Sequence, residues 1–401
     1  MSEALQKIPG GVCAAEGYRA AALHCGVKRV RSTKDDLALV VSDQPATVAG
    51  TFTTNQVKAA PVLLSQAHLR GGRARAVVLN SGNANACTGP EGMANARAMV
   101  EAAAKALGVP AGEVFIGSTG RIGVQLPVAK ITDAIPKLVG KLSRARSRAA
   151  AVAIMTSDTH PKQSAYAATA GKKTFRVGGI AKGAGMINPQ MATMLSVITT
   201  DLAAPAKALQ PILREAVESS FNRITVDGDT STNDTVLLLA NGASGVTLDD
   251  RNTELFESAL RAVCLDLARQ IVHDGEGISR VIELTVRGAR SERDAAHAAK
   301  AVGNSILLKC AWAGADPNWG RIVDALGYSA AKIHPDKVDV YYEDIALVLG
   351  GQPVEGSEAP ARRIAAKKDF RITVDLHRGP GEYTLLTTDL TEEYVRLNLS
   401  E

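Results

Sequence analysis

Short apolar runs alternate with a longer helical pattern in the first part of the chain. The runs Leu37–Val41, Thr47–Thr53 and Ala76–Leu79 are rich in Val, Leu, Thr or Ala and are bounded by Gly, Asn or Asp, which is typical of strands. Glu91–Leu107 is rich in Ala and is followed by Gly108, so it is predicted to be a helix that ends in a glycine cap. The alternation of the two kinds of element favours a layered α/β fold.

The middle of the chain contains three further strand candidates. Val114–Ile116 precedes a predicted turn at residues 117–120, and Lys173–Gly178 precedes a glycine-containing segment that starts at Lys182. The third candidate, Met194–Thr200, is mostly apolar and β-branched, as is typical of a buried strand.

The second half contains the clearest helix of the sequence, Thr253–Ile271. Its apolar residues recur at steps of three or four along one face, namely Phe256, Leu260, Val263, Leu267 and Ile271. Strands are predicted after it, at Val281–Val286, Val338–Tyr342, Arg371–Leu376 and Glu382–Thr388. The polar stretch Pro353–Arg362 contains Pro and Gly and is predicted to be a surface loop.

The composition is that of a chain with a large buried core. The 401 residues are 46% hydrophobic and only 4% aromatic, and small apolar residues let helices and sheets pack closely. The length suggests two or three domains, but no flexible linker separates the halves, so we expect them to share one packed body. The net charge of +5 is spread along the chain, and its basic clusters have no interleaved aromatic residues. We therefore expect no nucleic-acid partner.

The cysteines and the N-terminal residues indicate the cellular compartment in which the protein is expected. The five cysteines, Cys13, Cys25, Cys87, Cys264 and Cys310, are an odd number without CxxC spacing. This argues against a disulfide framework or a zinc site and for a reducing environment. The first residues lack the apolar core of a secretory signal, and no apolar run approaches the roughly 20 residues that cross a bilayer. We expect no membrane partner, and either a cytoplasmic protein or one whose targeting segment has been removed.

The common catalytic and binding motifs are absent. The sequence has no Walker A pattern, no HExxH and no GxSxG around a serine. The segment Asp227–Asp234 is rich in oxygen ligands, but it lacks the glycine at the sixth position of a calcium loop and has Leu238 at the twelfth. No metal site is therefore expected.

The segment 182–195 carries the candidate chemistry. Its glycines allow close backbone access, Lys182 supplies a cation, and Thr193 follows Ala192 at the start of the predicted strand. A threonine hydroxyl becomes a useful nucleophile when the residue is N-terminal, because its own α-amine, with a pKa of about 7.7–8.0, then acts as the base. Taken alone, an internal Ala-Thr at the start of a strand is structural in most proteins, since β-branched threonine favours strands.

This segment closely resembles the self-cleavage motif of the ornithine/glutamate N-acetyltransferases of arginine biosynthesis, in which Met-Ala-Thr-Met-Leu is cut between Ala and Thr. Other parts of the chain resemble the same family in the same order, at residues 80–89, 117–120, 155–159, 224–234, 274–277 and 316–321. The matching blocks span almost the whole chain. The sequence is therefore identified as a member of this family.

The resemblance assigns roles to particular residues. Thr193 is implied to be the nucleophile, first in the cleavage between Ala192 and Thr193 and then in acetyl transfer. The products are an α chain of residues 1–192 and a β chain of residues 193–401. Thr119 and Gly120 match the oxyanion hole, whose donors stabilise the tetrahedral intermediate. Substrate-contacting positions are matched by Thr156, Lys182, Thr193, Glu276 and Asn398. A lysine suits the carboxylate of an N-acetyl amino acid, and a glutamate suits the cationic amine of ornithine.

The resemblance also implies a fold, a mechanism and an assembly. The family fold is an α/β sandwich that resembles N-terminal nucleophile hydrolases but has different connectivity. Acetyl passes from N²-acetylornithine to Thr193 and then to glutamate in a ping-pong reaction, and some members also accept acetyl-CoA. No metal or prosthetic group is needed, and the family assembles as an α₂β₂ heterotetramer.

Two positions depart from the family pattern. Members usually continue a few residues beyond the position of Asn398 to a small hydroxyl residue that helps to bind substrate, whereas this sequence ends at Glu401. His160 stands where the family more often has an apolar or aromatic residue. We interpret His160 as a variable position for which no catalytic role is needed.

Two other interpretations remain open at this point. A related self-processing aminopeptidase would use water instead of glutamate as the acceptor, although the matches at Thr156, Lys182 and Glu276 disfavour it. A protein without catalytic activity would bind an amino acid or a nucleotide with the glycine loop at Lys182. The second interpretation predicts a single intact chain.

Overall fold

The computed structural model describes residues 5–28, 32–188 and 194–399, which form two compact units. Unit 1 comprises Met1–Gly183, Pro189–Asn222 and Asp229–Ile271. Unit 2 comprises Ala184–Asn188, Arg223–Gly228 and Val272–Glu401. The expected single packed body is therefore wrong for the last third of the chain, which has its own sheet and core.

Unit 1 is built on a nine-stranded mixed sheet with the order β1-β6-β7-β8-β9-β3-β4-β5, and β2 also pairs with β3. The strands are β1 (Leu5–Lys7), β2 (Tyr18–Leu23), β3 (Leu37–Phe52), β4 (Arg73–Asn83), β5 (Val114–Arg121), β6 (Lys162–Ala170), β7 (Lys173–Lys182), β8 (Leu195–Thr200) and β9 (Thr235–Ala240). The pairs β4–β5 and β8–β9 are parallel, whereas β7–β8 and β3–β9 are antiparallel.

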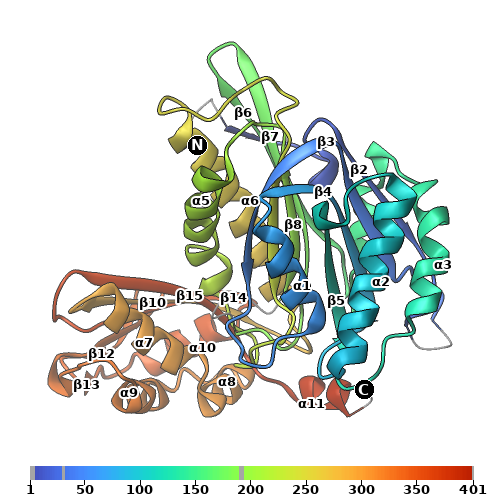
Figure 1. Cartoon of the computed structure of the whole chain (residues 1–401). Helices are drawn as coiled ribbons and strands as arrows, with labels where there is room; N and C mark the ends of the chain where they lie inside the picture. The colour runs from blue at the N-terminus through green and yellow to red at the C-terminus, as the bar shows by residue number, and fades with distance from the viewer. Residues whose placement is uncertain (1–4, 29–31, 189–193, 400–401) are drawn as a thin grey trace. The chain divides into compact units, whose positions relative to one another are not determined.

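Helices cover the sheet of unit 1 (Figure 1). They are α1 (Ala60–Leu69), α2 (Gly89–Leu107), α3 (Val128–Val139), α4 (Ser147–Ala153), α5 (Ala206–Glu218) and α6 (Thr253–His273). The first three form one core with β3, β4 and β5. Near the other end of the sheet, Phe256 of α6 lies against Phe175 of β7, with 6.1 Å between the ring centroids.

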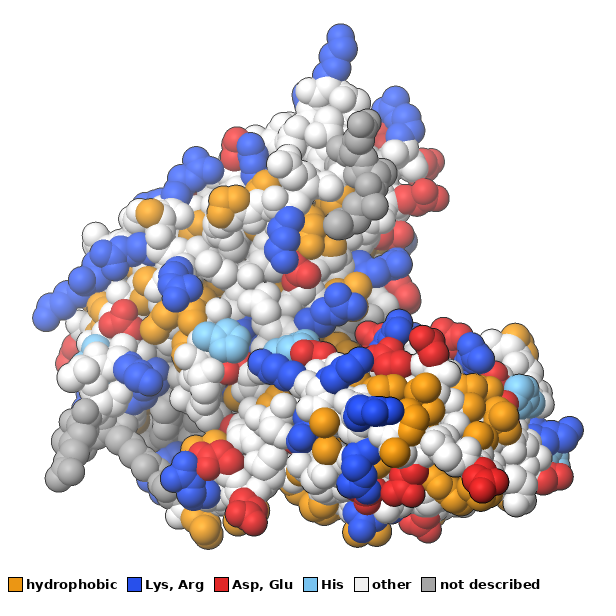
Figure 2. All heavy atoms as spheres, turned by 180° about the vertical axis from the view of Figure 1, so that it is seen from behind, with side chains coloured by type: hydrophobic (Ala, Val, Ile, Leu, Met, Phe, Trp, Pro, Cys, Tyr) orange, Lys and Arg blue, Asp and Glu red, His pale blue; other side chains and the backbone are white. Residues whose placement is uncertain are grey.

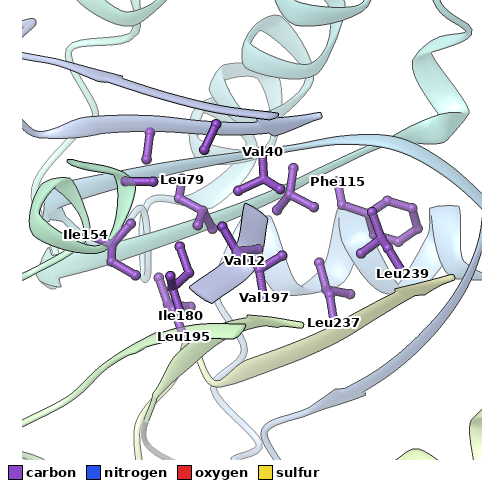
Figure 3. Close-up of a cluster of buried hydrophobic side chains, with 14 of the residues drawn as sticks. Val12, Val40, Leu79, Phe115, Ile154, Ile180, Leu195, Val197, Leu237 and Leu239 are labelled. Atoms are coloured by element: carbon purple, nitrogen blue, oxygen red, sulfur yellow. The ribbon is translucent and has the colours of Figure 1, made fainter. Parts of the chain in front are cut away.

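The side chains of the unit 1 strands lie in two apolar layers, one on each face of the sheet. In β3, Leu37 and Leu39 point to the core that includes α1–α3, whereas Ala38 and Val40 belong to the opposite core. This opposite core gathers side chains from β3, β4, β5, β7, β8, β9 and α4 (Figure 3). The period of two follows from the pleat of a strand and explains why both faces of the sheet are apolar.

Unit 2 is a second layered α/β structure. Its six-stranded sheet has the order β13-β12-β11-β14-β10-β15. The strands are β10 (Val281–Ala289), β11 (Asp339–Tyr342), β12 (Ile345–Leu349), β13 (Gln352–Pro353), β14 (Asp369–Asp375) and β15 (Gly381–Thr388), and the helices are α7 (Glu292–Gly303), α8 (Ile306–Ala313), α9 (Trp319–Tyr328), α10 (Glu358–Ala365) and α11 (Glu392–Asn398). Its core centres on Trp312, Tyr342 and Phe370, and the Trp312 indole donates to the Tyr342 hydroxyl at 3.2 Å.

The layered α/β fold and most of the expected elements are confirmed. Residues 37–41 and 47–52 belong to one continuous strand, β3, which ends one residue before the predicted end at Thr53. The turn expected at residues 117–120 is wrong, because β5 continues to Arg121 in register with β4. The loop expected at Pro353–Arg362 is wrong in part, because α10 begins at Glu358.

Lys and Arg side chains are interspersed with Asp and Glu over the face that Figure 2 shows. Within the described residues, every helix is too short or too polar to cross a membrane.

Candidate functional site

A buried carboxylate in unit 1 organises several of the predicted residues. Asp158 lies between α4 and β6, and its carboxylate accepts hydrogen bonds from the Gly183 amide at 2.7 Å and from the Thr156 amide at 3.0 Å. The ammonium of Lys162 donates to it at 2.7 Å, and that of Lys182 lies 3.9 Å away. Asp158 thus joins Thr156, which lies shortly after α4, to Lys182, the last residue of β7.

The charges of this cluster stabilise one another. Burial alone would raise the pKa of Asp158, but the ammonium groups of Lys182 and Lys162 and the hydrogen bonds outweigh burial and hold the pKa well below its usual range. Asp158 is therefore ionised at neutral pH. With two lysines and one carboxylate, these three side chains carry one excess positive charge.

Lys182 also reaches the predicted oxyanion-hole strand. Its ammonium lies 3.3 Å from the Thr119 hydroxyl on β5. β5 and β8 are far apart in the strand order, but the sheet brings them together: a side chain on Gly117 would come within 3.4 Å of Leu195 at the beginning of β8. The end of β5, the end of β7 and the beginning of β8 therefore meet inside unit 1.

Gly120 occupies a position that requires glycine. Its φ of +128° lies in a region that side chains rarely adopt, and a Cβ there would lie 2.6 Å from the Asn83 amide nitrogen. The backbone at Gly120 is therefore held against β4, where Gly82 is its partner in register. This close approach gives the Thr119–Gly120 peptide a fixed position.

Glu276 and Asn398 lie together in unit 2. The Asn398 side-chain amide donates to the Glu276 carboxylate at 3.2 Å and to the Tyr394 carbonyl at 2.9 Å. The Glu276 amide donates to the Ala184 carbonyl at 3.1 Å, and a side chain on Gly185 would overlap the Glu276 carboxylate. The glycine-rich segment after Lys182 thus makes room for the carboxylate of Glu276.

The structure brings together most of the residues that the sequence indicated. Thr119, Gly120, Thr156 and Lys182 form one group in unit 1, and Glu276 and Asn398 form another in unit 2. Ala192 and Thr193 lie outside the described residues. His160 is exposed, and its Nδ1 lies 3.1 Å from the hydroxyl of Thr159.

Sequence reasoning missed Asp158 and Lys162, both fully buried side chains. Asp158 stands inside the matching block at residues 155–159, and a charged residue between apolar or small neighbours was the available signal. Among the described residues there is no group of three or more His, Cys, Asp or Glu side chains that would hold a metal ion. All five cysteines are described, and none forms a disulfide bond.

Comparison with known proteins identifies one family over nearly the whole chain. The model of the ArgJ family matches residues 19–400. An arginine biosynthesis bifunctional protein ArgJ from Geobacter sulfurreducens is 48% identical over 96% of this chain and 98% of its own length. A glutamate N-acetyltransferase from Methanocaldococcus jannaschii is 45% identical over 98% of this chain and 99% of its own. A solved chain of ornithine acetyltransferase from Mycobacterium tuberculosis, crystallised with ornithine, is 43% identical and is matched over its whole length by 48% of this chain, with a TM-score of 0.44.

Proposed function

Because this chain belongs to the ArgJ family, as its sequence motifs predicted, we propose that it is an acetyltransferase that moves the acetyl group of N²-acetyl-L-ornithine to L-glutamate in arginine biosynthesis. The observation that carries the proposal is the family match over residues 19–400. The contact between Lys182 and Thr119 supports it, because it places a cation beside the strand that would hold the oxyanion.

The reaction would proceed through an acetyl ester on Thr193. The Thr193 hydroxyl attacks the acetyl carbonyl carbon while its α-amine takes the hydroxyl proton. The bond between the carbonyl carbon and the ornithine nitrogen breaks, and ornithine leaves with that proton. The amine of glutamate then attacks the ester, which releases the threonine hydroxyl and forms N-acetylglutamate.

The N-terminal threonine would arise by self-cleavage between Ala192 and Thr193. The hydroxyl of Thr193 attacks the preceding carbonyl, the peptide bond is replaced by an ester, and water hydrolyses that ester. The products are chains of residues 1–192 and 193–401. The antiparallel pairing of β7 with β8 would keep the two products together through backbone hydrogen bonds.

The oxyanion hole would be formed by Thr119 and Gly120. Donors at this position stabilise the negative oxygen of both tetrahedral intermediates, and losing one typically costs a factor of about 10²–10³ in rate. The fixed backbone at Gly120 supports the proposal, since such donors work best when they are held in place beforehand.

The substrate would be bound by ion pairs with its carboxylate and with its side-chain ammonium. We assign the carboxylate of N-acetylornithine to Lys182, with Thr156 beside it, and the side-chain ammonium of ornithine to Glu276, with Asn398 beside it. The excess positive charge near Lys182 supports the first assignment, and the acidic side chain of Glu276 supports the second.

Three further properties are proposed from the relatives, the family and the cysteines. Use of acetyl-CoA as a second donor is supported by the Geobacter sulfurreducens relative, which is named a bifunctional protein of arginine biosynthesis. An α₂β₂ assembly follows from the family. A cytoplasmic localisation is supported by the five cysteines, none of which is disulfide-bonded.

The test is an assay of purified protein with N-acetylornithine or with acetyl-CoA, each with glutamate. N-acetylglutamate from the first pair, with a covalent acetyl group on residue 193, supports the proposal. Hydrolysis of N-acetylornithine without transfer to glutamate would support the aminopeptidase interpretation instead. Label on a cysteine or serine would contradict the threonine ester.

A further inference from the structure

A short segment of unit 2, residues 184–188, is held by the carboxylate of Asp227, which the proposed reaction does not use. The amides of Met186 and Ile187 donate to this carboxylate at 2.5 and 2.8 Å. The Ile187 carbonyl in turn accepts from the Val226 amide at 2.7 Å. The backbone of the segment is therefore fixed through its donors as well as through an acceptor.

Met186 has a backbone conformation that few residues other than glycine adopt. Its φ is +56°. Two successive amides that bind one anion form a concavity of the backbone, and here the carboxylate of Asp227 occupies it. A residue with a side chain persists in this conformation only where its surroundings hold it. We therefore expect the conformation of Met186 to depend on Asp227.

The segment held in this way lies directly against Glu276. The Glu276 amide donates to the Ala184 carbonyl at 3.1 Å. A Cβ on Gly185 would lie within 2.6 Å of both oxygens of the Glu276 carboxylate. Gly185 directly precedes Met186 in the chain. A shift of the Met186 amide would therefore move the backbone against which the Glu276 carboxylate lies.

Helix α11 connects Asp227 to Glu276 by a second route. The Tyr394 hydroxyl donates to the Asp227 carboxylate at 3.3 Å. The Tyr394 carbonyl accepts from the side-chain amide of Asn398 at 2.9 Å, and the same amide donates to the Glu276 carboxylate at 3.2 Å. The contacts thus form a closed ring within unit 2, which passes through residues 185–186 on one side and through α11 on the other. Glu276 is held from two sides, and Asp227 supports both.

We propose that Asp227 and Tyr394 are positioning residues that determine the donor specificity of the acetyl-transfer site, because they hold Glu276 where it binds the side-chain ammonium of the donor. This inference rests on the proposed function, which assigns that ammonium to Glu276. A carboxylate recognises an ammonium group through short, charge-assisted hydrogen bonds, which require a fixed geometry. Asp227 and Tyr394 therefore contribute to the preference for a cationic donor without touching it.

The test compares N-acetylornithine with N-acetylnorvaline, which lacks only the side-chain ammonium, with glutamate as the acceptor. The ratio of the two kcat/KM values measures recognition of the ammonium, since a general loss of activity lowers both values equally. Rates are referred to the self-cleaved fraction of each preparation. Wild type should prefer N-acetylornithine by about 10–150-fold, as expected for a charged hydrogen bond.

The variants of the ring should lose part of this preference. Asp227→Ala should lower the ratio by about tenfold, because misplacing a binding group by even 1 Å is costly. Tyr394→Phe removes one hydrogen bond and should lower the ratio by about threefold. In both variants N-acetylornithine should lose more activity than N-acetylnorvaline.

Asp339 provides matched controls in the same unit. Its carboxylate accepts from the Gly350 amide at 2.8 Å and from the Tyr341 hydroxyl at 3.2 Å, and it also pairs with His377. Like Asp227, it thus binds a backbone amide and a tyrosine hydroxyl, but these bonds hold β11 and the turn at Gly350. Asp339→Ala and Tyr341→Phe should lower Tm and leave the donor ratio at the wild-type value.

Failure of this inference differs from failure of the proposed function. Wild type that transfers no acetyl group to glutamate overturns the proposed function, and a wild-type ratio near one overturns the binding of the ammonium by Glu276; the inference falls in either case. If wild type prefers N-acetylornithine and both Asp227→Ala and Tyr394→Phe keep the wild-type ratio, the inference alone is overturned. A ratio that falls as far in Asp339→Ala as in Asp227→Ala also overturns it. If Asp227→Ala does not fold, the ratio of Tyr394→Phe against that of Tyr341→Phe decides.

Discussion

Lys182 lies in a nearly closed position beside the carboxylate of Asp158. Its side chain is 9% exposed, and burial of an ammonium group without a nearby carboxylate costs free energy. Asp158 also binds Lys162 and the Gly183 amide, so it joins the first residue of β6 to the residue that follows β7. The same carboxylate that permits the burial of Lys182 therefore also fixes where its ammonium lies.

Replacing Lys182 should weaken substrate binding without unfolding the protein. A charged hydrogen bond contributes about 1.5–3 kcal/mol, so Lys182→Ala should lower kcat/KM for N-acetylornithine by roughly 10–150-fold. Glu276→Gln should cause a loss of similar size, because it removes the charge that would pair with the ornithine ammonium. Lys173→Ala, at the exposed opposite end of β7, is the control and should leave kcat/KM unchanged. Wild-type values for both site variants would show that these substrate contacts are wrongly assigned.

Strand β5 illustrates what the sequence could and could not predict. Its apolar start, Val114–Ile116, was predicted from the local pattern, and the family resemblance implied an oxyanion-hole role for Thr119 and Gly120 near its end. The extension through residue 121 was missed, because the glycines at 117 and 120 indicated a turn, whereas pairing with β4 keeps them in a strand. Local propensity is overridden here by a partner that is distant in sequence.

The contacts of the site depend even more on the tertiary structure. Lys182 was recognised, but its neighbours Asp158 and Thr119 come from two other segments, and no spacing in the sequence indicates their distances.

Changing Gly120 tests the end of β5. Gly120→Ala places a methyl group against the Gly82–Asn83 backbone at an unfavourable φ, so the peptide must move. We expect a kcat lower by about 10²–10³, the effect of losing one oxyanion donor. Gly112→Ala, where a Cβ meets nothing within 4 Å, is the control. Equal kcat for the two variants would contradict the role of Gly120.

In unit 2, a buried lysine links α8 to β15 and predicts a dependence of stability on pH. The Lys309 ammonium donates to the Thr387 hydroxyl at 2.9 Å and the Thr388 carbonyl at 2.7 Å. Burial lowers its pKa from 10.5 to about 7, although Asp227 and Asp389 act in the opposite direction. Between these two values the unfolded chain holds the proton more tightly than the folded protein, so Lys309 makes stability rise with pH from about 7 to 10.5.

The prediction is tested by thermal unfolding of wild type and Lys309→Met between neutral and alkaline pH. Methionine does not titrate, so the Tm of the variant minus that of wild type should become more negative as the pH rises. A difference that is independent of pH would show that Lys309 is charged in the folded protein over this whole range.

At the scale of the whole molecule, the chain order and the strand order do not coincide. In the sheet of unit 1, β8 and β9 lie between β7 and β3. A cut between residues 192 and 193 would therefore leave two strands of the second product hydrogen-bonded on both sides by strands of the first. Neither product would contain the complete sheet of unit 1, so cleavage and dissociation are separate events.

Self-cleavage should therefore change the number of chains but not the size of the native protein. Wild type should give two bands on a denaturing gel, with threonine as the first residue of one, and a single native species in size-exclusion chromatography. Thr193→Ala lacks the hydroxyl that both steps need, so it should remain one inactive chain with the same elution volume. Thr193→Ser keeps a hydroxyl but loses the methyl group that restricts χ1, so it should cleave more slowly.

The products of wild type should separate only in denaturant, because the ladders β7–β8 and β3–β9 must break together. Active wild-type protein that consists only of an intact chain would refute the threonine nucleophile, whereas products that separate under native conditions would refute the shared sheet.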